Sequence, residues 1–156
     1  MLKNVLRLFA FAGFALAAAI PMTASAAGGG GGGGLTGITV SIGSPINLQN
    51  KLLVSVPVTV TCTGQLPNAF GFGEVDVVIE QANGKSVATG VGGFLLADCP
   101  TSPQTVIVLV TPISYGYAPA VPFHGGKAIA FAGASACDAI EYYCIGGSVG
   151  PQPVHI

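Results

Sequence analysis

The chain has 156 residues, of which 7% are charged and 51% are hydrophobic, and its mean hydropathy is +0.71. This length suits a single domain with one core. The composition excludes a polar disordered chain, which needs many charges and few apolar residues, and it disfavours a helical bundle, whose solvent-facing sides need Glu, Lys and Arg.

The N-terminal residues 1–26 have the three-part pattern of a secretory signal peptide. Lys3 and Arg7 come first, and an apolar run of 13 residues follows at 8–20. Small residues at Ala24-Ser25-Ala26 then fit a cleavage site. A membrane anchor is the alternative, but a span needs about 20 apolar residues. No cysteine lies near the cleavage site and no twin arginine precedes it, so we expect Sec-type export of a secreted, periplasmic or extracellular bacterial protein.

Cleavage after Ala26 would leave 130 residues with a net charge of −3, from three lysines and six carboxylates. Phosphate backbones and anionic lipids are bound by clusters of Arg and Lys, and no such cluster is present. We therefore expect no nucleic acid partner and no membrane insertion after cleavage.

Seven consecutive glycines at 28–34 follow the cleavage site. A phosphate-binding loop would need a strand before the glycines and Gly-Lys-Ser/Thr after them, and neither is present. Residues 27–36 are therefore predicted to be a flexible leader, and residues 37–156 are predicted to be the folded domain.

Alternation of apolar and polar residues predicts seven strands. The clearest pattern is at 52–63, although Pro57 within it favours an edge position or a bulge. Asn83-Gly84 marks a hairpin turn. The unbroken apolar run at 106–110 indicates either burial on both faces or an exposed apolar face. The predicted strands are 38–42, 52–63, 74–81, 86–97, 104–111, 127–137 and 145–156.

Two of these strands have unusual composition. Glycines at 90, 92 and 93 predict a bulge or a bend in the fourth strand, and the sixth strand is rich in alanine, a poor strand former. Only residues 138–143 could form a helical turn. Seven short strands without crossover helices predict an all-β fold, a seven-stranded immunoglobulin-like β-sandwich.

The four cysteines are expected to form disulfides in an exported chain. They contain no CxxC pair, which argues against a zinc knuckle or a thioredoxin-like redox site. If consecutive strands run antiparallel, all four lie at one end of the sandwich. We prefer the pairs Cys62–Cys99 and Cys137–Cys144. The alternative is Cys62–Cys137, as in antibody domains, but the Trp and Tyr that accompany that pair are missing.

Together with this layout, the segment from Cys137 to Cys144 and the glycine-rich strand after it resemble small exported bacterial immunoglobulin-like domains. More loosely, they resemble the neocarzinostatin family of apo-chromoproteins. The resemblance implies a secreted seven-stranded sandwich with two short-range disulfides, one of which closes the loop before the last strand. The chain departs from that family in its long first disulfide loop and in the absence of a chromophore-pocket motif, so the ligand is not implied.

Catalytic and metal-binding patterns are weak, and we expect neither an enzyme nor a cofactor. The two histidines, His124 and His155, have no nucleophile beside them in the sequence, and Ser135 lies within a predicted strand rather than at a nucleophile elbow. Carboxylates at 98, 138 and 141 gather at the cysteine end but lack an EF-hand pattern. No metal site is predicted.

Three loops meet at the cysteine end: 64–73, 98–103 and 138–143. Aromatic residues on rigid loops give a large contact area at low entropic cost. The alternative for the two phenylalanines is that they cap the core. We expect an exported, non-catalytic binding module for a small apolar ligand or a surface partner; the alternative is a structural cell-envelope or surface-assembly component. The candidate ligand-binding residues are Phe70, Phe72, Tyr142 and Tyr143.

Overall fold

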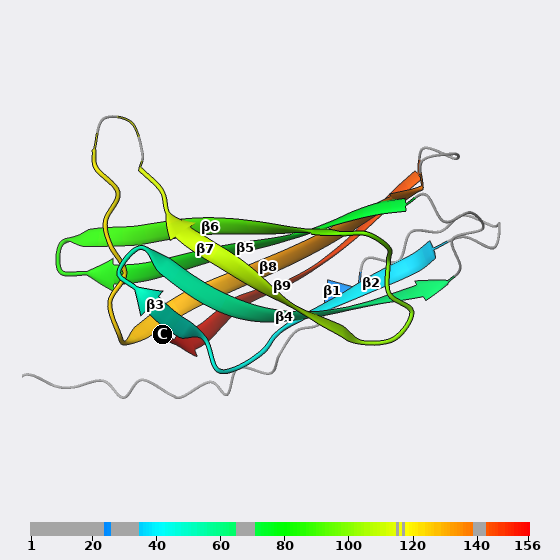
Figure 1. The fold of residues 1–156 in the computed structure, drawn as a ribbon, viewed down its shortest axis with the longest axis horizontal. Helices are drawn as coiled ribbons and strands as arrows, with labels where there is room; N and C mark the ends of the chain where they lie inside the picture. The colour runs from blue at the N-terminus through cyan, green and yellow to red at the C-terminus, as the bar shows by residue number, and fades with distance from the viewer. Residues whose placement is uncertain (1–23, 26–34, 65–70, 115, 117, 139–142) are drawn as a thin grey trace, which may run out of the picture.

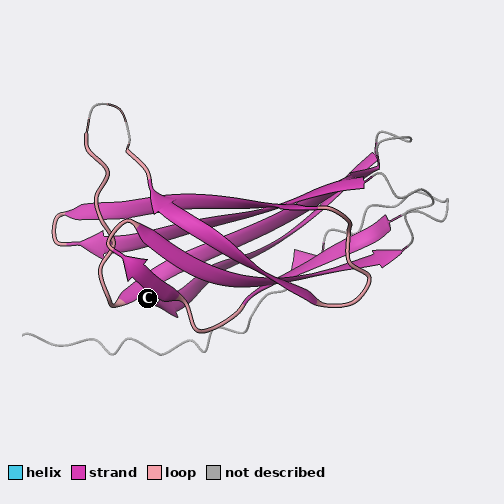
Figure 2. Ribbon diagram, in the orientation of Figure 1, coloured by secondary structure: helices cyan, strands magenta, loops and turns pink. Residues whose placement is uncertain are grey.

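The computed structural model describes residues 24–25, 35–64, 71–114, 116, 118–138 and 143–156. Those residues form nine β-strands and no helix (Figure 2), so the expected all-β class is confirmed. In this part of the chain no helix is long and apolar enough to cross a membrane. The strands are β1 (Ala24–Ser25), β2 (Leu35–Ile42), β3 (Asn47–Asn50), β4 (Leu53–Gly64), β5 (Gly71–Asn83), β6 (Ser86–Leu96), β7 (Gln104–Pro112), β8 (Lys127–Asp138) and β9 (Tyr143–His155).

All strand pairs are antiparallel, and their hydrogen-bonded order is β1-β9-β8-β5-β6-β7-β4-β2, with β3 paired to β4. Only two residue pairs join β6 to β7, Gly90 with Pro112 and Val91 with Thr111. Elsewhere β7 diverges from β6 and pairs with β4 (Figure 1). The sheet therefore curls on itself into a barrel-like shape.

The seven predicted strands are all present, but the sheet does not divide into two separate parts as expected, because the β6–β7 pairs connect them. Two further strands were not expected. β3 has the sequence Asn-Leu-Gln-Asn, which shows no run of alternating apolar residues. β1 lies within the predicted signal peptide and pairs with Gly147 and Ser148 of β9.

The core is built from alternate residues of the facing strands. Val54, Val56, Val58 and Val60 of β4 are completely buried, as the alternation predicts. Burying one such side chain contributes about 1.5–3 kcal/mol before the entropic cost of folding. The other strands contribute in the same alternating way, chiefly through Ile38 and Val40, Val75, Val77 and Ile79, and Val106, Val108 and Val110.

The apolar run at 106–110 has one buried face and one exposed face. Its even-numbered residues point into the core, whereas Ile107 and Leu109 expose 52% and 48% of their surfaces. Of the two readings of this run, the exposed apolar face is therefore the correct one.

The alanines of β8 explain how a poor strand former makes a long central strand. Alanines at 128, 130, 132, 134 and 136 all point inward and are buried. Their small size lets β2 lie close to the opposite layer. β2 also lies close to Gly147 of β9, where an added Cβ would collide with the carbonyl oxygen of Ile38. Packing, rather than intrinsic propensity, selects the small residues here.

Pro57 does not make β4 an edge strand, because β4 pairs with β7 on one side and with β2 and β3 on the other. The β2 pairing ends at Val58 and the β3 pairing begins at Ser55, so Pro57 faces the gap between them. Its carbonyl oxygen accepts a hydrogen bond of 2.7 Å from Gly43 N–H on that side. In an antiparallel strand the N–H of a residue points the same way as its carbonyl. The N–H that proline lacks would therefore point into this gap, and no hydrogen bond of the β2 or β3 ladder is lost.

Residues 118–126 lie at the end of the sheet away from the cysteines (Figure 1). Phe123 is buried to 1% exposure, and its N–H donates to the carbonyl of Lys51 at 2.9 Å. Gln81 is also buried, and its side-chain amide makes two hydrogen bonds to the backbone of His124, at 2.8 and 2.9 Å. The buried Phe123 ring and the buried Gln81 amide thus hold this loop in place.

Candidate binding surface at the disulfide end

Both disulfides have the predicted pairing. Cys62, near the end of β4, is joined to Cys99 in the loop after β6, with 5.8 Å between their Cα atoms. Cys137 of β8 and Cys144 of β9 are register partners in the sheet, with 4.0 Å between their Cα atoms. The alternative pair Cys62–Cys137 is therefore wrong, and no described cysteine is free.

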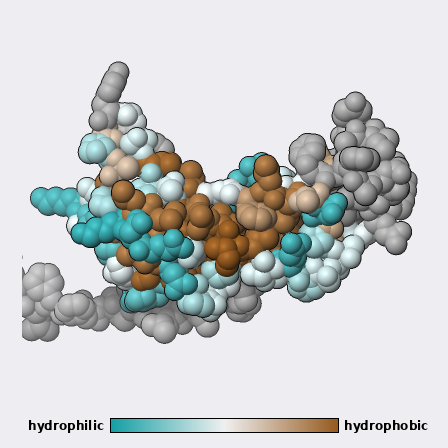
Figure 3. Space-filling model, viewed as in Figure 1, coloured by the Kyte–Doolittle hydropathy of each residue, from teal (hydrophilic) through white to brown (hydrophobic). Residues whose placement is uncertain are grey.

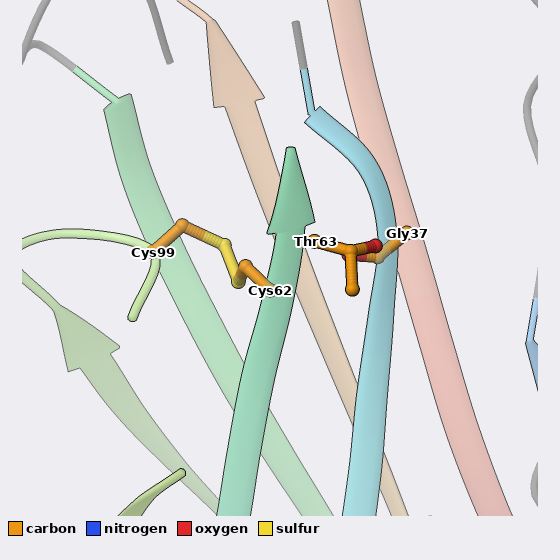
Figure 4. Close-up of a disulfide and its surroundings, with 4 residues drawn as sticks. All are labelled: Gly37, Cys62, Thr63 and Cys99. Atoms are coloured by element: carbon orange, nitrogen blue, oxygen red, sulfur yellow. A yellow bond between two sulfur atoms is a disulfide. The ribbon is translucent and has the colours of Figure 1, made fainter. Parts of the chain in front are cut away.

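The first disulfide fixes the base of one predicted loop (Figure 4). Cys62 is buried, and its N–H donates to the carbonyl of Pro100 at 2.7 Å. On the other side of β4, the Thr63 hydroxyl donates to the carbonyl of Gly37 in β2 at 3.3 Å. The segment 98–103 is thus tied to β4 by one covalent bond and one backbone hydrogen bond, and β4 is tied to its neighbour.

The second disulfide lies where three strands meet. Gly71 at the start of β5 pairs with Asp138 at the end of β8, and Asp138 also pairs with Tyr143 at the start of β9. The segments 65–70 and 139–142 therefore leave the sheet from adjacent strand ends. The disulfide one residue further along, Cys137–Cys144, holds two of those three strand ends together.

Of the four predicted aromatic residues, Phe70 and Tyr142 lie outside the described residues. The backbone of Phe72 belongs to β5 and pairs with Cys137, and the backbone of Tyr143 begins β9. The side chains of these two residues also lie outside what the structure describes. The prediction that the four aromatic rings form a binding surface stays a prediction.

The histidines have structural surroundings. The two ring nitrogens of His124 lie 3.0 Å from the carbonyl of Gly125 and 3.2 Å from the carbonyl of Ala82, so the side chain helps to hold its loop on β5. His155 is exposed at the end of β9. Ser135 is a strand residue, paired with Glu74. Within the described ranges no three His, Cys, Asp or Glu side chains are grouped so as to hold a metal ion.

A groove of about 560 Å³ lies away from the disulfides, between the β2–β3 connection and the end of β9. It is lined by residues 42–46 and 152–156, and Ile42, Ile46 and Ile156 are buried there. Sequence reasoning did not find this groove, because its two sides are about a hundred residues apart in the chain and neither carries a motif.

A comparison of the chain with models of protein families, with curated proteins and with solved structures found no match.

Proposed function

We propose that this protein is an exported, non-catalytic binding module whose loops at the disulfide end, 64–73, 98–103 and 138–143, contact a small apolar ligand or a surface partner. The observation that carries the proposal is that each disulfide lies at the base of one of these loops. Rigid scaffolds that fix loop bases are the usual setting for binding loops. Phe70, Phe72, Tyr142 and Tyr143 would supply the contact area.

Export rests on residues 1–26 as a signal peptide and 27–36 as a leader. Two disulfides are compatible with an extracellular protein. Cleavage after Ala26 would also remove β1, which pairs with only two residues of β9. The domain that remains would lose little of its sheet.

We also propose that the domain is a variant of the immunoglobulin-like sandwich, with a layout like that of the neocarzinostatin family. The short-range disulfide before the last strand supports this relationship. The arrangement of the strands supports it as well, because the group that contains β6 and the group that contains β7 are joined by only two β6–β7 residue pairs.

A dye-binding experiment tests the loop function. The apolar dye 8-anilino-1-naphthalenesulfonate should bind the oxidised protein, and the double variant Phe70→Ser/Tyr142→Ser should weaken that binding about tenfold, because two aromatic contacts are lost. The matched control is Leu52→Ser/Val87→Ser, which removes two exposed apolar side chains at the ends of β4 and β6 that lie away from the disulfides. Dye binding that falls only in the control, or in neither variant, would contradict the proposal.

A second candidate function is a structural component of a cell envelope or surface assembly. The observation that favours it is that β2, β4, β6 and β7 contain no charged residue, which lowers the barrier to association. Sedimentation velocity separates the two functions: species that keep growing with protein concentration would support the structural component over the binding module.

A further inference from the structure

An open edge of the sheet runs along β9. One side of β9 pairs with β8, and on the other side the only described partner is β1, through Ala24 with Ser148 and Ser25 with Gly147. β2, at the opposite end of the strand order, contacts β9 without pairing with it. Cleavage after Ala26 would remove β1, so the exported domain would keep this edge without its partner.

The backbone of β9 at 144–149 is directed so that it can pair with a further strand. Gly126 and Ile156 exchange two backbone hydrogen bonds, so the even-numbered residues of β8 direct their N–H and C=O groups toward β9. Gly147 is the register partner of one of them, Ala134, and therefore bonds toward β8. Its neighbour Ser148 directs its N–H and C=O toward the open edge. Edge groups of this kind readily accept another chain.

Prolines confine the acceptor edge to this part of β9. Pro153 is the register partner of Ile129, an odd-numbered residue of β8, so the Pro153 nitrogen faces the open edge and has no N–H to offer. Pro151, two residues earlier, lacks the same donor. A strand can therefore be added at 144–149, where β1 pairs, and not at 151–155.

The space beside the edge selects small, uncharged residues in an added strand. Ala134 is buried, so its partner Gly147 lies on the core face of the sheet. There an added Cβ would collide with the carbonyl oxygen of Ile38 in β2. A residue paired with Gly147 lies on the same face, beside β2, and in β1 this residue is Ser25. Because β2 and β9 contain no Asp, Glu, Lys or Arg, a charge buried there would have no partner.

The edge leads into the groove at 42–46 and 152–156. That groove is lined by the β2–β3 connection and β9 rather than by β8, so it lies on the open side of β9. A segment that runs antiparallel to β9 would reach the groove with residues roughly five positions before the one that pairs with Ser148. In strand addition, backbone pairing supplies affinity and side-chain pockets supply specificity. The groove is such a pocket, with apolar walls that include Ile42 and Val154.

Exposed apolar side chains elsewhere do not offer a comparable site. Figure 3 shows apolar side chains across the middle of the molecule, and on β7 the exposed ones are Ile107 and Leu109. Nothing in the described part of the chain shows what would cover them. At the β9 edge, by contrast, an extended segment is already seated.

We propose that the β9 edge at 144–149 is an acceptor site for an extended, uncharged segment of another protein. The segment adds antiparallel to β9, with a small residue opposite Gly147 and an apolar side chain in the groove. Ala24–Ser25 occupy the site in the uncleaved chain. The inference rests on the proposed cleavage after Ala26 and does not depend on the loop function, because the paired residues lie outside the three loops.

Amide hydrogen exchange on the processed protein, which begins at Ala27 and has both disulfides formed, tests the proposal. The probe is a synthetic peptide with the sequence of residues 18–27 of this chain. The Ser148 amide should exchange rapidly in the protein alone and at least about tenfold more slowly with saturating peptide. The Gly147 amide is the internal control, because it bonds to β8 and should be equally protected with and without peptide.

Two changes test the geometry of the site. The peptide variant Ser25→Trp should not protect Ser148, because the indole ring would collide with β2. In the protein, Ser148→Pro removes the outward N–H but no bond to β8. By fluorescence anisotropy of labelled peptide, it should bind about tenfold or more weakly than the matched control Ser148→Ala.

Circular dichroism and a count of free thiols confirm that each protein variant is folded and oxidised. Three results would each overturn the proposal: a Ser148 amide that is already protected in the protein alone or stays unprotected at millimolar peptide, a Trp peptide that protects it as well as the parent peptide, or equal peptide binding by the Pro and Ala variants. The N-terminal mass of the exported protein is measured separately. An uncleaved N-terminus would contradict the proposed export, whereas the peptide results would still decide the acceptor edge.

Discussion

Gly92 and Gly93 are adjacent glycines in β6 that we expect to respond in opposite ways to the same substitution. Neither has a positive φ, so only the surrounding space distinguishes them. A Cβ on Gly92 would collide with the carbonyl oxygen of Leu109 and would lie 2.8 Å from its carbonyl carbon. A Cβ on Gly93 would meet nothing closer than the Asp76 carboxylate, at 3.5 Å.

Gly92→Ala can be accommodated only if β7 moves away from β6, because the obstacle is backbone rather than the end of a flexible side chain. Overpacking of this kind costs about 1–3 kcal/mol, partly offset by roughly 0.4–1 kcal/mol from the reduced entropy of the unfolded chain. The net cost is therefore up to about 2.6 kcal/mol, and the melting temperature should fall by up to about 10 °C. Gly93→Ala makes only ordinary contacts and keeps the entropic gain, so its melting temperature should stay unchanged or rise by a few degrees.

Thermal melts followed by far-ultraviolet circular dichroism, with both disulfides intact, provide the comparison. Equal shifts in the two variants would refute the close crossing of β7 over Gly92. A stabilised Gly92→Ala variant would refute it as well.

Three further predictions follow from the packing. Deleting residues 154–156 should lower the free energy of unfolding, measured in a thermal melt, by several kcal/mol, because Ile156 is buried and exchanges two backbone hydrogen bonds with Gly126. In the same thermal melt, deleting residues 1–34 should change the melting temperature by only about 2 °C. Gln81→Leu should lower the free energy of unfolding by about 1–3 kcal/mol and should abolish the hydrogen-exchange protection of the His124 amide. A His124 amide that stays protected in this variant would contradict the prediction. In denaturant titrations, replacing Cys62 and Cys99 together by serine should cost about 4 kcal/mol, against about 2.5 kcal/mol for the pair Cys137 and Cys144, because the first loop spans 37 residues and the second spans 7.

The predictable parts of the fold are those that depend on local sequence patterns. The alternation through Val54–Val60 identified the central strand and its buried face, and the strand directions brought the correct cysteines together. The curl of the sheet was not predictable, because it depends on where β7 leaves β6, and that is set by close contacts at Gly90 and Gly92 with distant segments. Glycines there indicated a bend but not the strand that would cross them.

The position of Pro57 was also not predictable from the local sequence. Proline within a strand pattern favours an edge or a bulge. β4 is not an edge strand, and Pro57 is tolerated because the β2–β3 connection leaves a gap in the ladder in front of this residue. Phe123 lies in a loop rich in Pro and Gly and carries no periodic signal, yet it is one of the most buried side chains. For the candidate site, the loop bases were predictable from the cysteines. Which face of residues 106–110 stays uncovered was not predictable, because it depends on how β7 packs against the rest of the sheet.

The connectivity of the two disulfides divides the covalent structure of the domain. Cys62–Cys99 closes within the part that precedes the loop at 113–126, and Cys137–Cys144 closes within the part that follows it. That loop is therefore the sole covalent link between two internally cross-linked pieces. The contacts that also hold them together include the ten residue pairs of the β5–β8 ladder and the hydrogen bonds between Gln81 and His124. A single proteolytic cut in the loop would turn folding into a bimolecular reaction, in which two oxidised fragments reassemble by complementation at a rate that depends on their concentration.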